Sequence, residues 1–464
     1  MKCAMRLIAA ILSGILLLGL AACDTPDPSP APTEPPIPAI KAYDTATERL
    51  KAAPNRVLVY TVTTTCTAGG QTYTEKVEGK ASFSKVGTEE MVAVVQENWD
   101  YDTLSANYLL SFCNGRAYSR ISGSTFGADM GSAEFLASQL PVVLIDSTLY
   151  TSIGRVPAAD GTSIMFHQPK ALESWVNAPA DATNVKAYGS ALLDKNGALV
   201  QTTYQVTYAC GGAEFAVTAT LNCTTPAQLE LSALHPEHPE DYVMLACLDA
   251  PRLLLRAADH ILTANKLTAS ASETIYSQII PLTQERKSEI RLSGWKETLS
   301  AQLSNTVTVT DYREQPSTTK QVYDFISGVC SSTVDDGTPM VQPGITAETM
   351  RTSMEDSLLS ALFATRYLAG ATLTEDEDVY RLDFAGNDAY CEDLTRDLSA
   401  FFNLSLEGVT SHRDTVASGY LCIDKASGLP VAMGMYFTRT HISGDVPYVM
   451  SYQLDQVISL TPED

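Results

Sequence analysis

The chain has 464 residues, of which 45% are hydrophobic and 18% are charged. That apolar share excludes low-complexity disorder, because disordered chains lack the apolar residues that offset the entropy lost on ordering. The length predicts two to three domains. The formal net charge is −23, so the chain repels phosphate backbones and we expect no nucleic-acid partner.

Residues 1–22 predict a secretory signal peptide. Lys2 and Arg6 precede an apolar run over 7–20, which is too short for a permanent membrane-spanning helix. The run closes with Leu-Ala-Ala-Cys, which resembles a bacterial lipobox and makes Cys23 the expected site of lipid attachment, such as palmitate. We therefore expect a lipoprotein anchored to the cell membrane on its extracytoplasmic side. The alternative is an ordinary signal peptide whose cleavage site precedes a cysteine.

The segment 23–39 predicts an extended stalk. Seven prolines lie between residues 26 and 38. They forbid a helix and favour polyproline II, so this segment is expected to act as a spacer.

The rest of the chain predicts one unit present twice, with domains at 40–234 and 245–464. In the first domain, Tyr43, Ala46 and Leu50 fall at helical spacing before Pro54. The patterns that follow predict strands at 57–66, 72–83, 91–99 and 107–113, a helix at 132–140, a strand at 162–166, a helix at 170–176, and strands at 186–194, 198–209 and 213–223.

The second domain repeats this order. The predicted elements are a helix at 253–264, strands at 269–280, 288–299, 306–312 and 320–330, a helix at 347–368, a strand at 379–384, a helix at 389–402, and strands at 417–424, 429–440 and 448–460.

A shared motif supports the duplication. Gly-Ser-Ala-Leu-Leu-Asp-Lys-Asn-Gly at 189–197 matches Gly-Tyr-Leu-Cys-Ile-Asp-Lys-Ala-Ser-Gly at 419–428. In both copies the aspartate is expected to bond the backbone of its own turn. The last glycine is expected to take the left-handed position that closes a short hairpin.

On this motif and the element order, each half resembles the LolA/LppX-like lipoprotein-carrier superfamily. The resemblance implies an α+β fold with two tandem half-open antiparallel β-barrels, or curved sheets, each with helices covering the concave face. It also implies a non-enzymatic activity, the shelter of a lipid or another apolar group between sheet and helices.

No enzyme signature, cofactor motif or metal site is predicted. None of the six histidines lies in a His-Glu-x-x-His arrangement or beside paired cysteines. His235 and His238 form the one cluster with ligand-type residues, but the prolines beside them indicate a stiff connector between the domains instead.

Eight cysteines remain after Cys3 and Cys23 are set aside, and an even number outside the cytoplasm permits disulfides. Two pairs are candidates, Cys66 with Cys210 and Cys391 with Cys422. The alternative is that these cysteines are buried free thiols, which pack as small apolar residues.

Two closing strands of the second domain carry the candidate ligand-binding face. Alternation places one set of apolar side chains on one face of each strand: Val431, Met433, Met435 and Phe437, and Tyr448, Met450, Tyr452 and Leu454. Methionine and tyrosine suit an adaptable apolar surface with polar tips. The alternative is that this face is the sheet's core contact with its covering helix.

Two functions remain open. The first is a membrane-anchored, non-enzymatic lipoprotein that binds a lipid-like or other apolar ligand in a curved-sheet cavity. The second is a protein-interaction or sensory platform for an envelope partner, with no small-molecule ligand.

Overall fold

A computed structural model describes residues 38–139, 145, 147, 150–159, 161–169, 182–232, 242–295, 298–311, 313, 315–362, 364–404, 409–443 and 445–461. The predicted signal peptide with Cys23, nearly all of the stalk, the helix predicted at 170–176 and the His235–His238 connector lie outside these residues.

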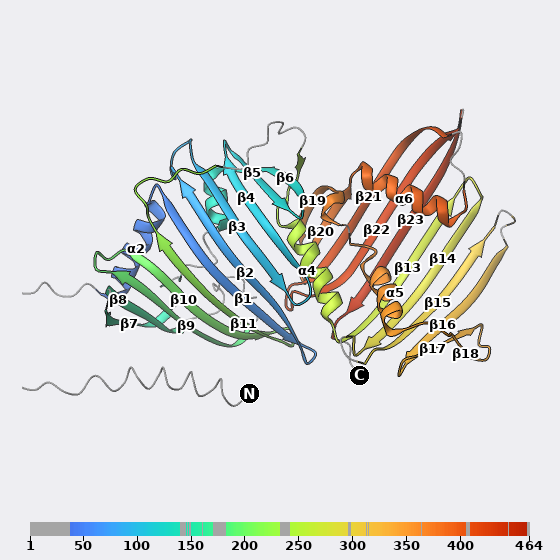
Figure 1. Cartoon of the computed structure of the whole chain (residues 1–464), viewed down its shortest axis with the longest axis horizontal. Helices are drawn as coiled ribbons and strands as arrows, with labels where there is room; N and C mark the ends of the chain where they lie inside the picture. The colour runs from blue at the N-terminus through green and yellow to red at the C-terminus, as the bar shows by residue number, and fades with distance from the viewer. Residues whose placement is uncertain are drawn as a thin grey trace, which may run out of the picture. The chain divides into compact units, whose positions relative to one another are not determined.

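The first half forms a 12-stranded sheet (Figure 1). Its elements are α2 (Ala39–Ala52), β1 (Arg56–Ala68), β2 (Gln71–Ser84), β3 (Val92–Tyr101), β4 (Ser105–Cys113), β5 (Arg116–Ile121), β6 (Ser124–Asp129), α3 (Ser132–Gln139), β7 (Tyr150–Ala158), β8 (Gly161–Pro169), β9 (Thr183–Asp194), β10 (Leu199–Cys210), β11 (Ala213–Thr224) and β12 (Val243–Met244).

The second half forms an 11-stranded sheet. Its elements are α4 (Ala250–Thr263), β13 (Lys266–Ser277), β14 (Leu282–Ser293), β15 (Ser300–Thr310), β16 (Pro316–Ile326), β17 (Val329–Val334), β18 (Met340–Val341), α5 (Ala347–Leu359), the 3-10 helix η3 (Thr365–Tyr367), β19 (Leu368–Glu375), β20 (Val379–Gly386), α6 (Asp388–Phe401), β21 (Val409–Asp424), β22 (Pro430–Ser443) and β23 (Val446–Ser459).

The two sheets follow the same path. In the first, β1 to β6 pair in succession, the chain then crosses to the opposite edge, and β7 to β11 return until β11 pairs with β1. In the second, β13 to β18 and β19 to β23 do the same, and β23 pairs with β13. Neither sheet closes on itself. The predicted fold class, two open curved antiparallel sheets with helices, is confirmed.

The shared turn motif forms as predicted. Asp194 accepts hydrogen bonds from the backbone N–H groups of Asn196 and Ala198, each at 2.8 Å. Asp424 accepts one from Ser427 at 2.6 Å. Gly197 and Gly428 both have positive φ, 74° and 71°, which explains why glycine ends the motif in each half.

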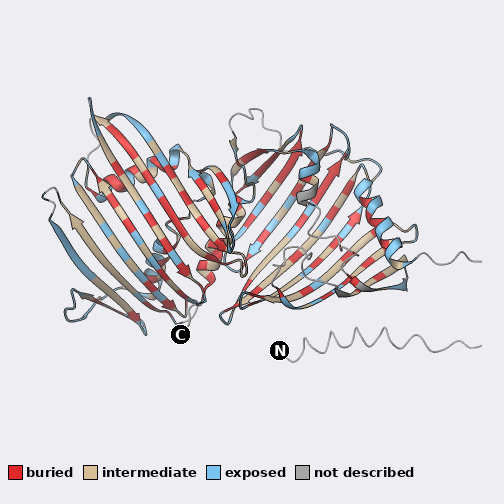
Figure 2. Cartoon of the chain, turned by 180° about the vertical axis from the view of Figure 1, so that it is seen from behind, coloured by how far each residue is buried: buried red, intermediate tan, exposed pale blue. Residues whose placement is uncertain are grey.

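Helices lie over the concave face of each sheet. In the first half α2 contacts β7 to β10, and in the second half α6 contacts β20 to β22. Buried and exposed residues alternate along most of the strands (Figure 2), as expected when one face packs against a core. Among the helices of the described residues, none is both long and apolar enough to span a bilayer.

Several strand boundaries differ from the prediction. The strand predicted at 320–330 is two strands, β16 and β17, because Ser327 and Gly328 form a turn with φ of 52° and 82°. The strand predicted at 288–299 is β14, which ends before Gly294, where φ is 67°. Short strands β5 and β6 follow similar turns and were not predicted.

The helix predicted at 347–368 is also shorter than expected. The helix α5 ends at Leu359, and the chain continues through η3 into the strand β19. The buried side chains Met350, Met354 and Leu358 set its helical spacing. In the sequence Leu362 continues this spacing, although in the structure it lies in the turn after α5, and Leu368 already begins β19.

Candidate functional site

The predicted ligand-binding residues lie on one face of β22 and β23. Met433, Phe437 and Met450 are fully buried there, and Met435 is contacted by the Tyr390 hydroxyl of α6. Val431, Tyr448 and Tyr452 are half-buried. The structure therefore brings the seven side chains together on the concave face, where Met435 contacts the covering helix α6.

This face continues into strands that carry less cover. Cross-strand register places Tyr452 beside Ile275, then Gln284, then Val309. Five half-buried side chains share the face, and we call them the open strip: Leu303, Val307, Val309, Tyr323 and Tyr452. In Figure 1 none of the described helices is drawn over the upper parts of β15 and β16. Leu303, Tyr323 and Tyr452 pack against the core, so the strip extends from the edge of the core along the concave face.

One ion pair lies beside the strip, in cross-strand register with Val307. The carboxylate of Glu273 is 2.6 Å from the guanidinium of Arg286, and its side chain is nearly buried while that of Arg286 is partly exposed. Burial, followed by the charge of Glu273, raises the pKa of Tyr452. The face thus holds the strip's apolar side chains, polar side chains such as Gln284 and Asn305, and one paired charge. This arrangement suits a ligand with an apolar body and a polar end.

A second polar cluster lies under α6. The guanidinium of Arg439 is buried, donates to the Thr395 hydroxyl at 2.8 Å and pairs with Glu392. His441 is fully buried, and its ring centroid lies 4.9 Å from that of His412. Burial, and then the neighbouring His412 and Arg439, lowers the pKa of His441 to about 4.

This histidine predicts loss of stability in acid. Between about pH 6.5 and pH 4, His441 is protonated in the unfolded chain but stays neutral in the folded chain. The free energy of unfolding therefore falls as the pH drops toward 4. We expect a contribution of up to about 2 kcal/mol between pH 6.5 and pH 5. Urea unfolding at both pH values should show that the free energy of unfolding falls less for His441→Phe than for the unmodified chain. His412→Ala, at an exposed position, should show most of the fall seen in the unmodified chain. Equal losses in all three proteins would contradict this reading.

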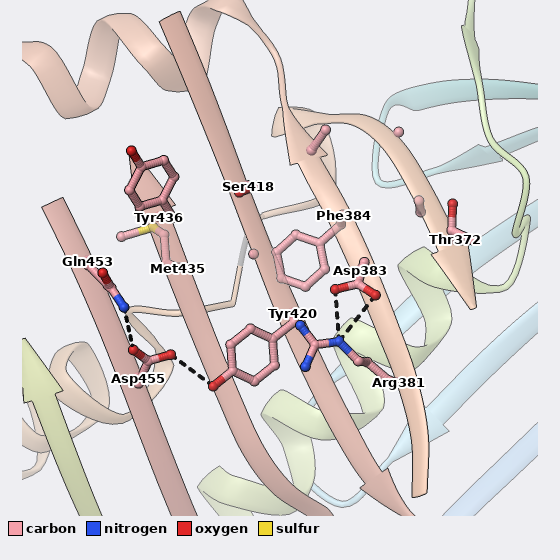
Figure 3. A pocket seen from close by; sticks show the side chains of 14 residues that line it. Thr372, Arg381, Asp383, Phe384, Ser418, Tyr420, Met435, Tyr436, Gln453 and Asp455 are labelled. Atoms are coloured by element: carbon pink, nitrogen blue, oxygen red, sulfur yellow. Dashed lines mark hydrogen bonds and ion pairs between the residues drawn. The ribbon is translucent and has the colours of Figure 1, made fainter. Parts of the chain in front are cut away.

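The outer face of the same sheet carries a hollow that the sequence did not predict (Figure 3). It encloses about 590 Å³. Its floor is a row of small residues on neighbouring strands, Gly370, Ala385 and Ser418. The exposed ring of Tyr436 continues this row on β22. Because these three small residues lie in register, the outer face is hollow at this point, where larger side chains would fill the space.

A polar network borders the hollow (Figure 3). The Tyr420 hydroxyl donates to Asp455 at 3.0 Å, and the Gln453 amide donates to the other oxygen of Asp455 at 2.8 Å. Arg381 donates to Asp383 at 3.0 Å, and its guanidinium carbon lies 4.3 Å from the centroid of the Tyr420 ring. Burial, and then Asp455, raises the pKa of Tyr420 to about 12. These contacts hold the two carboxylates in fixed positions.

Both candidate disulfide pairs are separated in the structure. Cys66 lies on β1 and Cys210 on β10, with β11 between them. Two strand spacings come to roughly 9–10 Å, beyond the Cα separation of a disulfide. Cys391 lies on α6, which covers the concave face, whereas Cys422 shares the outer face with Arg381. All four are free thiols, and burial raises the pKa of Cys66 to about 12.

The described residues contain no group of three or more histidine, cysteine, aspartate or glutamate side chains placed to hold a metal ion.

No family model matches the sequence, and no curated protein matches it. The structure is similar to the crystal structure of LprF from Mycobacterium bovis, with 10% identity, 47% of this chain and 96% of that chain covered, and a TM-score of 0.27. It is also similar to a DUF1329 family protein from Desulfovibrio piger, with 12% identity, 42% and 95% covered, and a TM-score of 0.19. Both TM-scores are below 0.5, so the function proposed below rests on this chain's own side chains.

Proposed function

We propose that this protein is a non-enzymatic binding protein, lipid-anchored at Cys23 outside the cell membrane, whose second sheet takes an apolar, lipid-like ligand. The observation that carries the proposal is the open strip: Leu303, Val307, Val309, Tyr323 and Tyr452 continue the buried concave face but remain half-buried. Each CH₂ group that a ligand buries there adds about 0.8 kcal/mol of binding free energy.

The neighbouring core is suited to such a ligand. Met433 and Met435 lie on the same face as the strip, and methionine adapts its shape at low cost. The Glu273–Arg286 pair, next to Val307 in register, would contact a polar head group. The ligand would therefore lie with its apolar part along the strip's side chains on β15 and β16 and its polar end beside this pair on β13 and β14.

The proposed anchor and stalk suit a protein that binds its ligand while it stays tethered, rather than a soluble carrier that moves between membranes. A 17-residue polyproline spacer at about 3 Å per residue would hold the folded part roughly 50 Å from the membrane. A protein fixed at that height would collect ligand near the membrane and keep its position.

The strip is tested by changing its two valines. The Val307→Asp/Val309→Asp double variant puts two carboxylates on the concave face, whereas Thr306→Asp/Thr308→Asp puts them on the outer face of the same strand. With N-phenyl-1-naphthylamine as the fluorescent apolar probe, we expect the valine variant to bind at least tenfold more weakly than the unmodified chain. The threonine variant should bind as the unmodified chain does. Absent probe binding, or equal effects of both variants, would refute the proposal.

The alternative function, a protein platform, is favoured by one observation. The edge formed by β16 to β18 exposes Ile326, Val329, Met340 and Val341, the last two at 59% and 67%. An exposed apolar sheet edge is a template for pairing with another chain. Self-association in sedimentation experiments that Val341→Lys abolishes, without probe binding, would support the platform over the ligand carrier.

A further inference from the structure

We infer that the outer-face hollow of the second sheet is a separate binding site for a saccharide. It lies on the face opposite the open strip, so it does not depend on the function proposed above. Its geometry is a floor of Gly370, Ala385 and Ser418 between the rings of Tyr436 and Tyr420.

The duplication provides an internal comparison. The shared motif aligns Gly189 with Gly419, so Tyr188 occupies the position of Ser418, and Ser190 that of Tyr420. Tyr188 is 54% exposed, and its ring centroid lies 6.1 Å from that of His167, which occupies the position of Ala385. In the first sheet, therefore, large side chains fill the place where the second sheet has its floor.

The polar border is also confined to the second sheet. Register places Met165 where the second sheet has Asp383, Thr220 where it has Asp455, and Gln205 where it has Tyr436. The first sheet thus lacks both carboxylates and the exposed ring. At each of the six positions compared here, the residue of the second copy either opens the hollow or adds a polar or aromatic group around it.

The chemistry of the border indicates the ligand class. Tyr436, 42% exposed, presents an apolar ring with a polar tip, which suits the C–H face of a sugar ring. Asp383 and Asp455 keep free lone pairs beside their existing bonds, and carboxylates accept from several donors. These oxygens suit adjacent sugar hydroxyls, and Arg381 offers further donors.

Size and charge agree with this class. The hollow's volume of about 590 Å³ lies within the roughly 300–1,000 Å³ of small-molecule sites. Two carboxylates and one guanidinium leave a single net negative charge, and each carboxylate already has a donor. An anion is therefore disfavoured, and a cation is the competing ligand to test.

The test uses the full chain and four probes: maltotriose, cellotriose, N,N′,N″-triacetylchitotriose and, as the competing cation, spermidine. Saturation-transfer NMR and calorimetry should detect at least one sugar. Ser418→Tyr, which copies the first sheet, and Tyr436→Ala, at an exposed position, should each weaken sugar binding at least tenfold. Tyr188→Ala, the matched change in the first sheet, should leave it unchanged.

Three results would overturn the inference: no binding of any of the three sugars, equal sugar binding by the variants and the unmodified chain, or binding of spermidine without any sugar. Probe fluorescence at the open strip should be the same in Ser418→Tyr and the unmodified chain, which separates this site from the apolar one.

Discussion

Replacing Asp259 with alanine should lower the free energy of unfolding by about 3–5 kcal/mol. Asp259 lies on α4, the first helix of the second half, and its side chain is buried, with the residue 1% exposed. Its carboxylate accepts from the backbone N–H groups of Thr103 and Leu104, at 2.7 and 2.8 Å, and from the Thr103 hydroxyl. The backbone N–H of Asp102 donates to the same carboxylate at 3.3 Å, so its removal leaves four donors of the first half without this acceptor.

Neighbouring contacts join the same two segments. Arg252 and Arg256 of α4 both lie 3.7 Å from Glu75 of β2. The Gln71 amide donates to the carbonyl of Thr263 at 2.7 Å. Because α4 packs on β19 and β22 as well, loss of Asp259 should loosen the attachment between the first sheet and the second.

Urea unfolding of the full chain measures this effect. Asp259→Asn keeps one accepting oxygen and should lose less than Asp259→Ala. Asp249→Ala, at an exposed aspartate preceding the same helix, should cost less than 1 kcal/mol. Similar small losses at both aspartates would show that Asp259 does not hold the halves together.

Substituting valine for Gly434 should cost about 2–3 kcal/mol. A Cβ at this position would overlap the Tyr420 ring and approach the carbonyl oxygen of Leu454 to 2.9 Å. The ring cannot move freely, because its hydroxyl is bonded to Asp455 and Arg381 lies over it. Valine favours strands, so any loss reflects the overlap rather than backbone propensity.

Gly370→Ala is the matched control for this glycine. Its Cβ would meet only Ala385 at 3.8 Å, an ordinary contact. Thermal unfolding should therefore separate the two variants, with Gly370→Ala unchanged or slightly stabilised. Equal melting temperatures for Gly434→Val and the unmodified chain would mean that the Tyr420 ring is not fixed by its partners.

The sequence was sufficient to predict the duplication, because each half repeats strand alternation, a covering helix and the Asp-Lys turn. It was not sufficient where local signals were short. The six-residue strands β5 and β6, which follow the turns at Asn114 and Ser122, resemble loops in the sequence, and Leu362 continues the apolar spacing of α5 beyond the helix. In these places tertiary pairing, not local pattern, decides the structure.

The concave face and the outer-face hollow also differ in how far the sequence predicts them. The methionines of β22 were predicted to share a face because alternation within one strand is visible in the sequence. The outer-face hollow was not, because its residues come from five strands, β19 to β23, and meet only through register. The one local signal was the replacement of Ser190 by Tyr420 between the aligned motifs.

The most direct test of the ligand-carrier account is native mass spectrometry of residues 39–464, which form one compact unit. This segment excludes Cys23, so no anchor lipid contributes to the mass. The account predicts a discrete excess of several hundred daltons over the denatured chain, released by organic solvent and absent from the Val307→Asp/Val309→Asp variant. A native mass equal to that of the bare chain, from protein purified without detergent out of its own cells, would contradict it.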